Sequence, residues 1–245
     1  MAGQGGVGCH PVLPSGSMAP RFGPHFYPMK HPVLLLSCIV LVCFTSGCVT
    51  GTRSLGVTVA PADSYAKGPP KGPIAIGDIS DARQFENKPD DPSTPSIDGD
   101  VYTLTPERRS TYIGRQRNTF GHAMGDIALP AGQTVQAKVA DLLREGLKQK
   151  GYEVVDTATT ENRATVEVQQ FWSWMTPGFF ALSFEAQIKC RVTISKDGKQ
   201  ASFIVKGYGL NHGQFAKDVN WQEAFDIAFA DFLKNFGEQA DAAGL

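Results

Sequence analysis

The stretch LSFEAQIKCRVTI, residues 182–194, decides the fold, because apolar and polar side chains alternate in it almost without a break. Residues at every second position share one face of a β-strand, so this strand has one apolar and one polar face. Such a pattern is typical of an antiparallel strand with one face on the core and the other in water. The sequence KDGK (196–199) follows and predicts a tight hairpin into a strand over 201–210.

Further strands are expected before this one. Residues 164–174 alternate in a similar way, and the aromatic stretch FWSWMTPGFF (171–180) joins them to residue 182. Two shorter β-branched segments, at 73–79 and 152–155, have the composition of strands. Together these segments predict one sheet.

Two helices are expected to cover that sheet. Residues 134–150 carry apolar side chains at helical spacing, and Gly151 stands where a left-handed C-cap belongs. The last helix is predicted to begin at Asn220, with Glu223 as its capping-box partner, and to end at Gly237. The order β-α-β-β-β-β-α predicts an α+β fold, in which two helices pack on one face of a mostly antiparallel sheet.

Residues 80–132 show no long helical pattern, and prolines are frequent in RQFENKPDDPSTPSIDGD (83–100). We expect a long loop with short extended pieces at 101–104 and 111–113. Loops of this length are often functional. The alternative is an insertion that lies on the surface without a role of its own.

The chain opens with an apolar leader. From Met29 it reads MKHPVLLLSCIVLVCFTSGC, and its apolar run is shorter than the about 20 residues that span a bilayer. Small residues precede Cys48, so the segment resembles the lipobox of bacterial lipoproteins. The resemblance implies that the Cys48 thiol carries the lipid and that Cys48 becomes the N-terminus. The alternative is a plain secretory signal with an incidental cysteine.

The leader also sets the expected domain limits and location. Because Val49, and not aspartate, follows Cys48, the resemblance implies a Gram-negative outer membrane, with the protein anchored by lipid and facing the periplasm. We expect a mis-called N-terminal extension over 1–28, a signal peptide over 29–47, a flexible tether over 48–72, and a single α+β domain over 73–240.

Composition excludes several classes of function. The chain has 245 residues and a net charge of −1, with no basic excess for a nucleic-acid partner. Beyond the leader only Cys48 and Cys190 could pair, so a disulfide framework is not expected. Cys190 falls on the apolar face of its strand and is expected to be a small buried side chain.

We find no motif for catalysis, a cofactor or a metal. A nucleophile elbow and the glycine loops that bind nucleotides are both missing from the sequence. His122 and His212 have no ligand partners at zinc spacing, and the aspartates of residues 90–100 lack calcium-loop spacing. Four arginines could bind an anionic headgroup or carboxylate, or could pair with those aspartates: Arg108, Arg109, Arg115 and Arg117.

The hairpin at 171–180 is the candidate partner site. Exposed aromatic side chains are typical of protein and membrane interfaces. In the alternative interpretation, Trp172 and Trp174 continue the inward face of their strand and cap the core. The candidate partner-binding residues are Phe171, Trp172, Trp174, Phe179 and Phe180.

The lipobox, the helix ending in LLREGLKQKGYEV, the long strands and the aromatic last helix together resemble the YajG-like family of uncharacterised bacterial lipoproteins. YIGRQRNTFG (112–121) is similar to an R-N-x-[FY]-G segment of some members. The family has no established activity, so the resemblance implies fold and location. The same architecture resembles the auxiliary lipoproteins of ABC-type lipid transporters.

From these resemblances we expect a non-catalytic accessory or binding subunit of a cell-envelope assembly or transport system. It would contact the membrane through its lipid and an envelope protein as its partner, and it would need no cofactor. The first alternative is direct binding of a lipid or glycan, with a cavity beside Phe225 and Phe229. The second is an envelope enzyme, which would need His122 or His212 to meet a carboxylate in a cleft.

Overall fold

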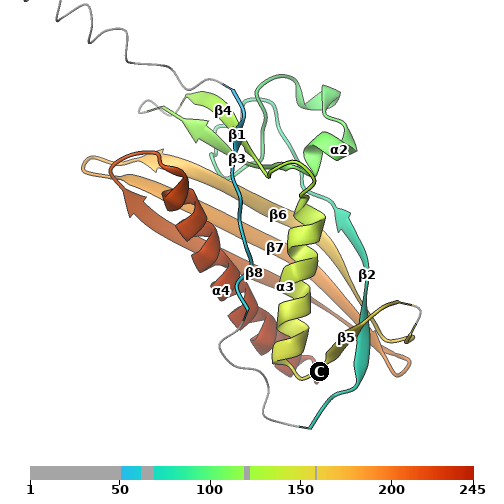
Figure 1. Cartoon of the computed structure of the whole chain (residues 1–245). Coiled ribbons are helices and arrows are strands. Elements are labelled where there is room, and N and C mark those ends of the chain that lie inside the picture. The colour runs from blue at the N-terminus through green and yellow to red at the C-terminus, as the bar shows by residue number, and fades with distance from the viewer. Residues whose placement is uncertain (1–50, 62–68, 119–121, 158) are drawn as a thin grey trace, which may run out of the picture. The chain divides into compact units, whose positions relative to one another are not determined.

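Three long strands form the centre of the sheet in the computed structural model, which describes residues 51–61, 69–118, 122–157 and 159–245. They pair antiparallel over their whole lengths, as Figure 1 shows. The hairpin between the last two turns at Asp197 and Gly198, which both have positive φ, as the KDGK sequence predicted. The three strands are β6 (Arg163–Pro177), β7 (Leu182–Lys196) and β8 (Lys199–Gly213).

The other edge of β6 is shared by two strands placed end to end. β2 (Pro73–Asp81) runs parallel to the first half of β6, and β3 (Tyr112–Arg117) runs parallel to its second half, at Ser173 and Trp174. Each of the two carries a further branch of the sheet. β5 (Glu153–Val155) pairs in parallel with β2, β4 (Ala123–Ala128) pairs antiparallel with β3, and β1 (Arg53–Ser54) pairs in parallel with β4.

The expectation of a mostly antiparallel sheet is therefore wrong. Over the described residues the sheet has eight strands and is mixed, because four of its pairs are parallel: β1–β4, β2–β5, β2–β6 and β3–β6. Alternation identifies a half-buried strand but carries no information on which strand pairs with it. In addition, β3 and β4 lie inside residues 80–132, where the sequence predicted a loop.

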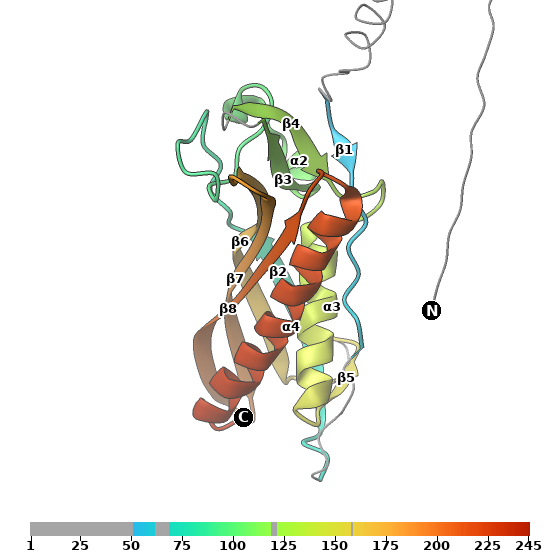
Figure 2. The ribbon, with the colours of Figure 1, turned by 90° about the vertical axis from the view of Figure 1, so that its left-hand side faces the viewer.

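Two long helices cover one face of the sheet (Figure 2). α3 (Val135–Gln149) is capped by the Thr134 hydroxyl, which accepts from the Ala137 amide, and Gly151 follows it with φ +86° as predicted. α4 (Asp218–Ala242) begins earlier than expected and continues through Gly237. Besides these, the described residues contain a single helical turn, α2 (Pro106–Arg109), and a 3-10 turn, η1 (Val101–Thr103), so the expected count of two helices is also corrected.

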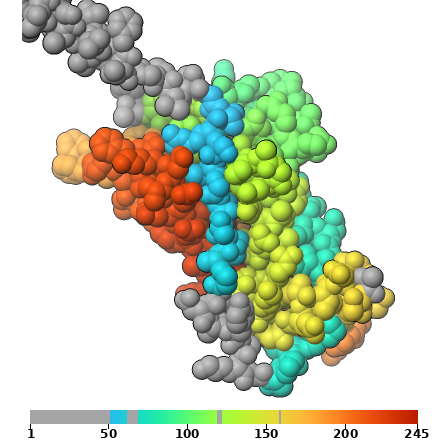
Figure 3. All heavy atoms as spheres, in the orientation of Figure 1, coloured from blue at the N-terminus to red at the C-terminus, as the bar shows by residue number. Residues whose placement is uncertain are grey.

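Residues 53–59 are part of the domain, although the sequence predicted a tether over 48–72. Leu55 and Val57 are buried in the main core, and Gln222 of α4 donates a hydrogen bond to the Gly56 carbonyl. The segment runs between α3 and α4, where the space-filling view shows it at the surface (Figure 3). The expected tether thus contains a stretch packed into the fold.

Both faces of the sheet are covered at the end of β6, and this explains why burial there does not alternate. Phe171 lies in the main core beneath α4, where its ring stacks on Phe225 with centroids 5.3 Å apart. Trp172 points to the opposite face, into a second cluster with residues of the segment 83–100, which we call the Pro-rich loop. That second cluster consists of Ile97, Leu104, Tyr112, Ala128, Trp172 and Trp174.

Candidate functional site

The structure divides the five aromatic residues of the predicted partner site into two groups. Phe171, Trp172 and Trp174 are buried, and Phe85 of the Pro-rich loop lies edge-on to Trp172. Phe179 and Phe180, in contrast, are 94% and 84% exposed. Only these two rings can therefore contact a partner without a change in the fold.

The two exposed rings stand on a tight turn. The Gly178 amide donates to the Ala181 carbonyl across the turn, and the rings of Phe179 and Phe180 lie edge to face with centroids 4.6 Å apart. β7 begins at Leu182, which pairs with Gly213 at the end of β8. Phe215, 69% exposed, follows in the loop to α4. We call Phe179, Phe180 and Phe215 the aromatic tip.

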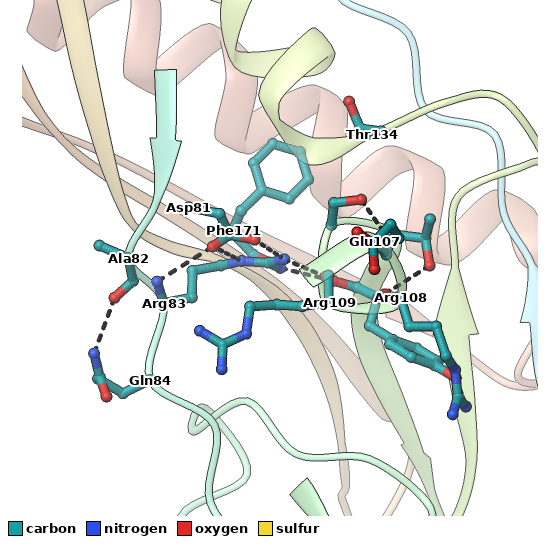
Figure 4. A network of polar contacts seen from close by, with 12 residues as sticks. Asp81, Ala82, Arg83, Gln84, Glu107, Arg108, Arg109, Thr134 and Phe171 are labelled. Atoms are coloured by element: carbon teal, nitrogen blue, oxygen red, sulfur yellow. Dashed lines mark hydrogen bonds and ion pairs between the residues drawn. The ribbon is translucent and has the colours of Figure 1, made fainter. Parts of the chain in front are cut away.

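A buried arginine joins the Pro-rich loop to the sheet (Figure 4). The Arg83 side chain is fully buried, and two of its nitrogens donate to the Asp81 carboxylate at 2.8 Å. It also donates to the carbonyls of Arg109 (2.7 Å), Tyr112 (2.7 Å) and Phe171 (3.0 Å). These five hydrogen bonds use all five donors of a guanidinium. They connect the end of β2 to α2, β3 and β6. No pattern in the sequence predicted these contacts.

A pocket of about 610 Å³ opens between the Pro-rich loop and the β3–β4 hairpin. Arg115 on its wall is held by two carboxylates, with Nη2 3.4 Å from Asp98 and Nη1 3.5 Å from Asp126. The Asp98 amide donates to both oxygens of Asp126, at 3.0 and 3.1 Å. Residues that line the pocket include Lys88, Asp90, Ser96, Asp98, Arg115, Arg117 and His122.

Burial shifts the pKa values of two charged side chains in this region. It raises the pKa of the Asp126 carboxyl, although the Asp98 amide and Arg115 oppose the change. It lowers the pKa of the Arg117 guanidinium, and repulsion from Arg115 adds to this effect. The position of Arg115 on the pocket wall is thus set by a partly buried network of two carboxylates.

The four arginines that the sequence grouped together do not form one cluster. Arg115 and Arg117 are on β3 and line the pocket. Arg108 and Arg109 are on α2, where Arg108 donates to the Tyr112 hydroxyl and Arg109 lies over the Phe85 ring, 5.5 Å from its centroid. Of the two interpretations of these arginines, pairing with the loop aspartates holds at Asp98.

The remaining candidate residues lie apart from one another. His122 lines the pocket, whereas His212 on β8 lies with Nδ1 3.3 Å from the Ser183 hydroxyl. Cys190 is buried on β7, and burial raises the pKa of its thiol.

In the part of the chain that the structure describes, no three residues of the types His, Cys, Asp and Glu are placed to hold a metal ion. None of the helices described is long and apolar enough to cross a bilayer. Cys48 lies outside the described residues.

The region between the sheet and α4 is filled with aromatic rings. Phe225 and Phe229 are buried; Phe225 stacks on Phe171, and Phe229 packs against the same ring at a tilt of 43°. Trp221 packs edge-on to Phe184 with centroids 5.1 Å apart. These rings occupy the place where direct capture of a lipid or glycan would require a cavity.

Several solved structures are similar to the chain. A protein of Xanthomonas campestris from the family DUF330 is 13% identical, with 78% of this chain and 98% of that chain covered and a TM-score of 0.41. A hypothetical protein of Chlamydia trachomatis is 9% identical, with 71% and 97% covered and a TM-score of 0.35. No protein of curated function matches the sequence.

A family model described as an uncharacterised lipoprotein matches residues 107–223, which extend from α2 into the first turns of α4. A lipoprotein is a membrane-anchored protein of the cell envelope. The resemblance seen in the sequence is thereby confirmed, because the model of the YajG-like family of uncharacterised lipoproteins matches residues 107–223.

Proposed function

We propose that the protein is anchored in the outer membrane by a lipid on Cys48, faces the periplasm, and acts as a non-catalytic accessory subunit. Its partner would be a protein of a cell-envelope assembly or transport system. Membership of a lipoprotein family supports the anchor. The pocket between the Pro-rich loop and the β3–β4 hairpin is the observation that carries the binding role.

The construction of this pocket favours binding. The Arg83 network holds the start of the Pro-rich loop against the sheet, and a fixed wall loses little conformational entropy when a partner binds. Gln170 of β6 adds a second attachment, because its side-chain amide donates to the Ser93 carbonyl at 2.7 Å. A loop held at both places presents its side chains in one arrangement.

The charges of the pocket suggest what it would bind. Asp98 and Asp126 compensate Arg115, whereas Lys88 is exposed at the rim, where Asp90 also lines the pocket. Ammonium and guanidinium groups form their strongest hydrogen bonds with carboxylates and phosphates. We therefore propose that an acidic segment of the partner protein occupies the pocket.

In-cell photo-crosslinking tests this role. A photoreactive residue replaces Lys88 in one strain and Lys199, an exposed lysine at the far β7–β8 turn, in a control strain. A discrete protein adduct from position 88 alone is the expected result. Equal adducts from both positions, or none from position 88, would overturn the binding role of the pocket.

The anchor is tested separately, by mass spectrometry of the protein extracted from membranes. The expected N-terminal residue is an acylated Cys48, and replacement by Cys48→Ala should release the protein into the periplasm. An unmodified Cys48 would overturn the anchor. The binding role of the pocket would then depend on the crosslinking result alone.

A further inference from the structure

We propose that the aromatic tip inserts into the surface of the membrane that holds the lipid anchor, so that the domain sits on the bilayer in one orientation. This inference rests on the acylation of Cys48 proposed above. It extends that proposal by naming which end of the domain faces the lipid and which side chains enter it.

Strand registers bring several chain turns to the same end of the sheet. β3 and β6 run parallel, with Arg115 opposite Trp174, so the C-terminal ends of these two strands point to one end of the sheet. Pro177 pairs with Leu182, and Leu182 pairs with Gly213, which brings the β8–α4 loop to that end too. Figure 1 shows the β6–β7 turn and the β8–α4 loop at the same end of the sheet.

The described chain also begins at this end. β1 runs parallel to β4, so Gly51 lies beside the first half of β4. Gly51 packs against Gly125, where an added Cβ would collide with the Gly51 carbonyl. The Arg53 guanidinium donates to the Ala216 carbonyl at 3.0 Å and pairs with Asp218 at 3.3 Å. The start of β1 therefore contacts the loop that carries Phe215.

The length of chain before Gly51 limits how far the anchor can lie from the domain. Two residues separate Cys48 from Gly51, and the three Cα–Cα steps between them span at most about 11 Å when fully extended. A free tether of the length predicted from sequence would impose no such limit. Because residues 53–59 are packed into the fold, an acylated Cys48 holds this end of the domain beside the bilayer.

The side chains at this end suit a lipid interface. Phe179, Phe180 and Phe215 are all exposed, and each would remove apolar surface from water by entering the region between headgroups and acyl chains. Lys217 is exposed beside them, with its ammonium 5.9 Å from the centre of the Phe215 ring. A lysine in this position can extend its charge to a lipid phosphate while its methylene groups cover the ring.

Fluorescence of the lipidated, full-length mature protein in vesicles tests the inference. The vesicles contain phosphatidylethanolamine and phosphatidylglycerol with brominated acyl chains, which quench tryptophan only at short range. The probe is Phe180→Trp, and the control is Lys199→Trp at the β7–β8 turn. The native tryptophans Trp172, Trp174 and Trp221 are buried and give the same background in both proteins.

We expect the emission of the Phe180→Trp protein to shift to shorter wavelength and to be quenched by bromine, whereas that of the Lys199→Trp protein is unchanged. Adding Phe179→Ser and Phe215→Ser to the probe should reverse both effects. Because all three rings are exposed, the melting temperature should not change, which excludes unfolding as the cause.

The other outcomes are distinct. Absence of quenching in a protein whose Cys48 is acylated would overturn this inference and leave the proposed anchor intact. An unmodified Cys48 would overturn both. A single protein adduct from a photo-crosslinker at position 180 in cells, without quenching in vesicles, would assign the aromatic tip to a protein partner and overturn the membrane contact.

Discussion

The Arg83 guanidinium and the Asp81 carboxylate form a doubly hydrogen-bonded ion pair inside the domain, with both nitrogen–oxygen distances at 2.8 Å. The side chain of Arg83 is fully buried, and that of Asp81 is 6% exposed. A buried pair of this kind persists only where its other donors are also satisfied. Here three backbone carbonyls complete the set, so the pair fixes the path of the chain after β2.

Removing the charge of Asp81 should therefore be costly. Asp81→Asn leaves the Arg83 charge buried without a counter-ion, and we expect a loss of about 3–5 kcal/mol in the free energy of unfolding. Urea unfolding measures this loss. The control is Asp141→Asn, which breaks the half-exposed pair with Arg144 and should cost no more than about 1 kcal/mol. Similar losses in the two variants would contradict the role of the pair.

Replacement by alanine should change the stability of the domain in opposite directions at two glycines, one in the strand beneath α4 and one in α4 itself. A Cβ at Gly209 of β8 would collide with the backbone of α4 at Ala224 and Ala228, so Gly209→Ala should destabilise the domain by about 1–3 kcal/mol or more. Gly237 lies inside α4 with nothing within 4 Å of an added Cβ. Gly237→Ala should stabilise the domain by about 0.5–1 kcal/mol.

Thermal and urea unfolding of these two variants give the comparison directly. The result that would count against close packing of α4 on β8 is a Gly209→Ala protein as stable as the parent. The neighbouring Gly207 has the same role, because a Cβ there would collide with the Ala228 carbonyl.

Tyr208 should make stability depend on pH in the alkaline range. Burial, followed by the hydrogen bond to Glu185 and repulsion from it, raises the pKa of the phenol to about 12 from 10.0. Since the folded-state pKa is the higher, the stabilisation is complete below about pH 10 and is lost as the pH rises toward 12. Tyr208→Phe should therefore flatten the fall of unfolding free energy over this range.

A spectrophotometric titration isolates the same group. The difference between the parent protein and Tyr208→Phe should show one phenol that ionises at about 12. Glu185→Gln should lower the pKa of Tyr208 but leave it above its ordinary value, because burial still acts on the phenol. A phenol that titrates normally in the parent would be inconsistent with this account.

The segment before β2 should contribute to stability like any other part of the core. Leu55 is 1% exposed, and Leu55→Ala should cost about 2–5 kcal/mol in the free energy of unfolding. Thr58→Ala, at an exposed position of the same segment, should change it by no more than about 0.5 kcal/mol. If Leu55→Ala had as little effect as Thr58→Ala, the segment would be a tether after all.

The sequence predicted the elements whose burial is periodic. β7 alternates because one of its faces lies on the core and the other is partly exposed, and α3 has a single apolar stripe. β3 and β4 escaped prediction for the opposite reason. Arg115, Gln116 and Asp126 are buried in them, and the charges satisfy one another across the hairpin. A pattern of hydropathy cannot distinguish such paired charges from a solvated loop.

The candidate site was predicted only in part, because its geometry depends on distant contacts. The sequence grouped five aromatic residues as a candidate site and left open that Trp172 and Trp174 cap the core. In the structure Phe171 and Trp172 point to opposite faces that are both covered. The Pro-rich loop covers the second face, and nothing local to β6 indicates this. The burial of Arg83 could not be predicted from its sequence neighbours either, because its hydrogen-bond partners come from α2, β3 and β6.

The route of β1 has a mechanical consequence. Tension applied to the chain ahead of Arg53 acts along the strand, so it loads the pairing with β4 in shear. To slip, the segment must drag Leu55 and Val57 out of the core while Arg53 releases both Ala216 and Asp218. Under shear these contacts must all break at the same time, whereas a force perpendicular to the strand would break them one after another. The domain is therefore most resistant to a pull applied at the start of β1.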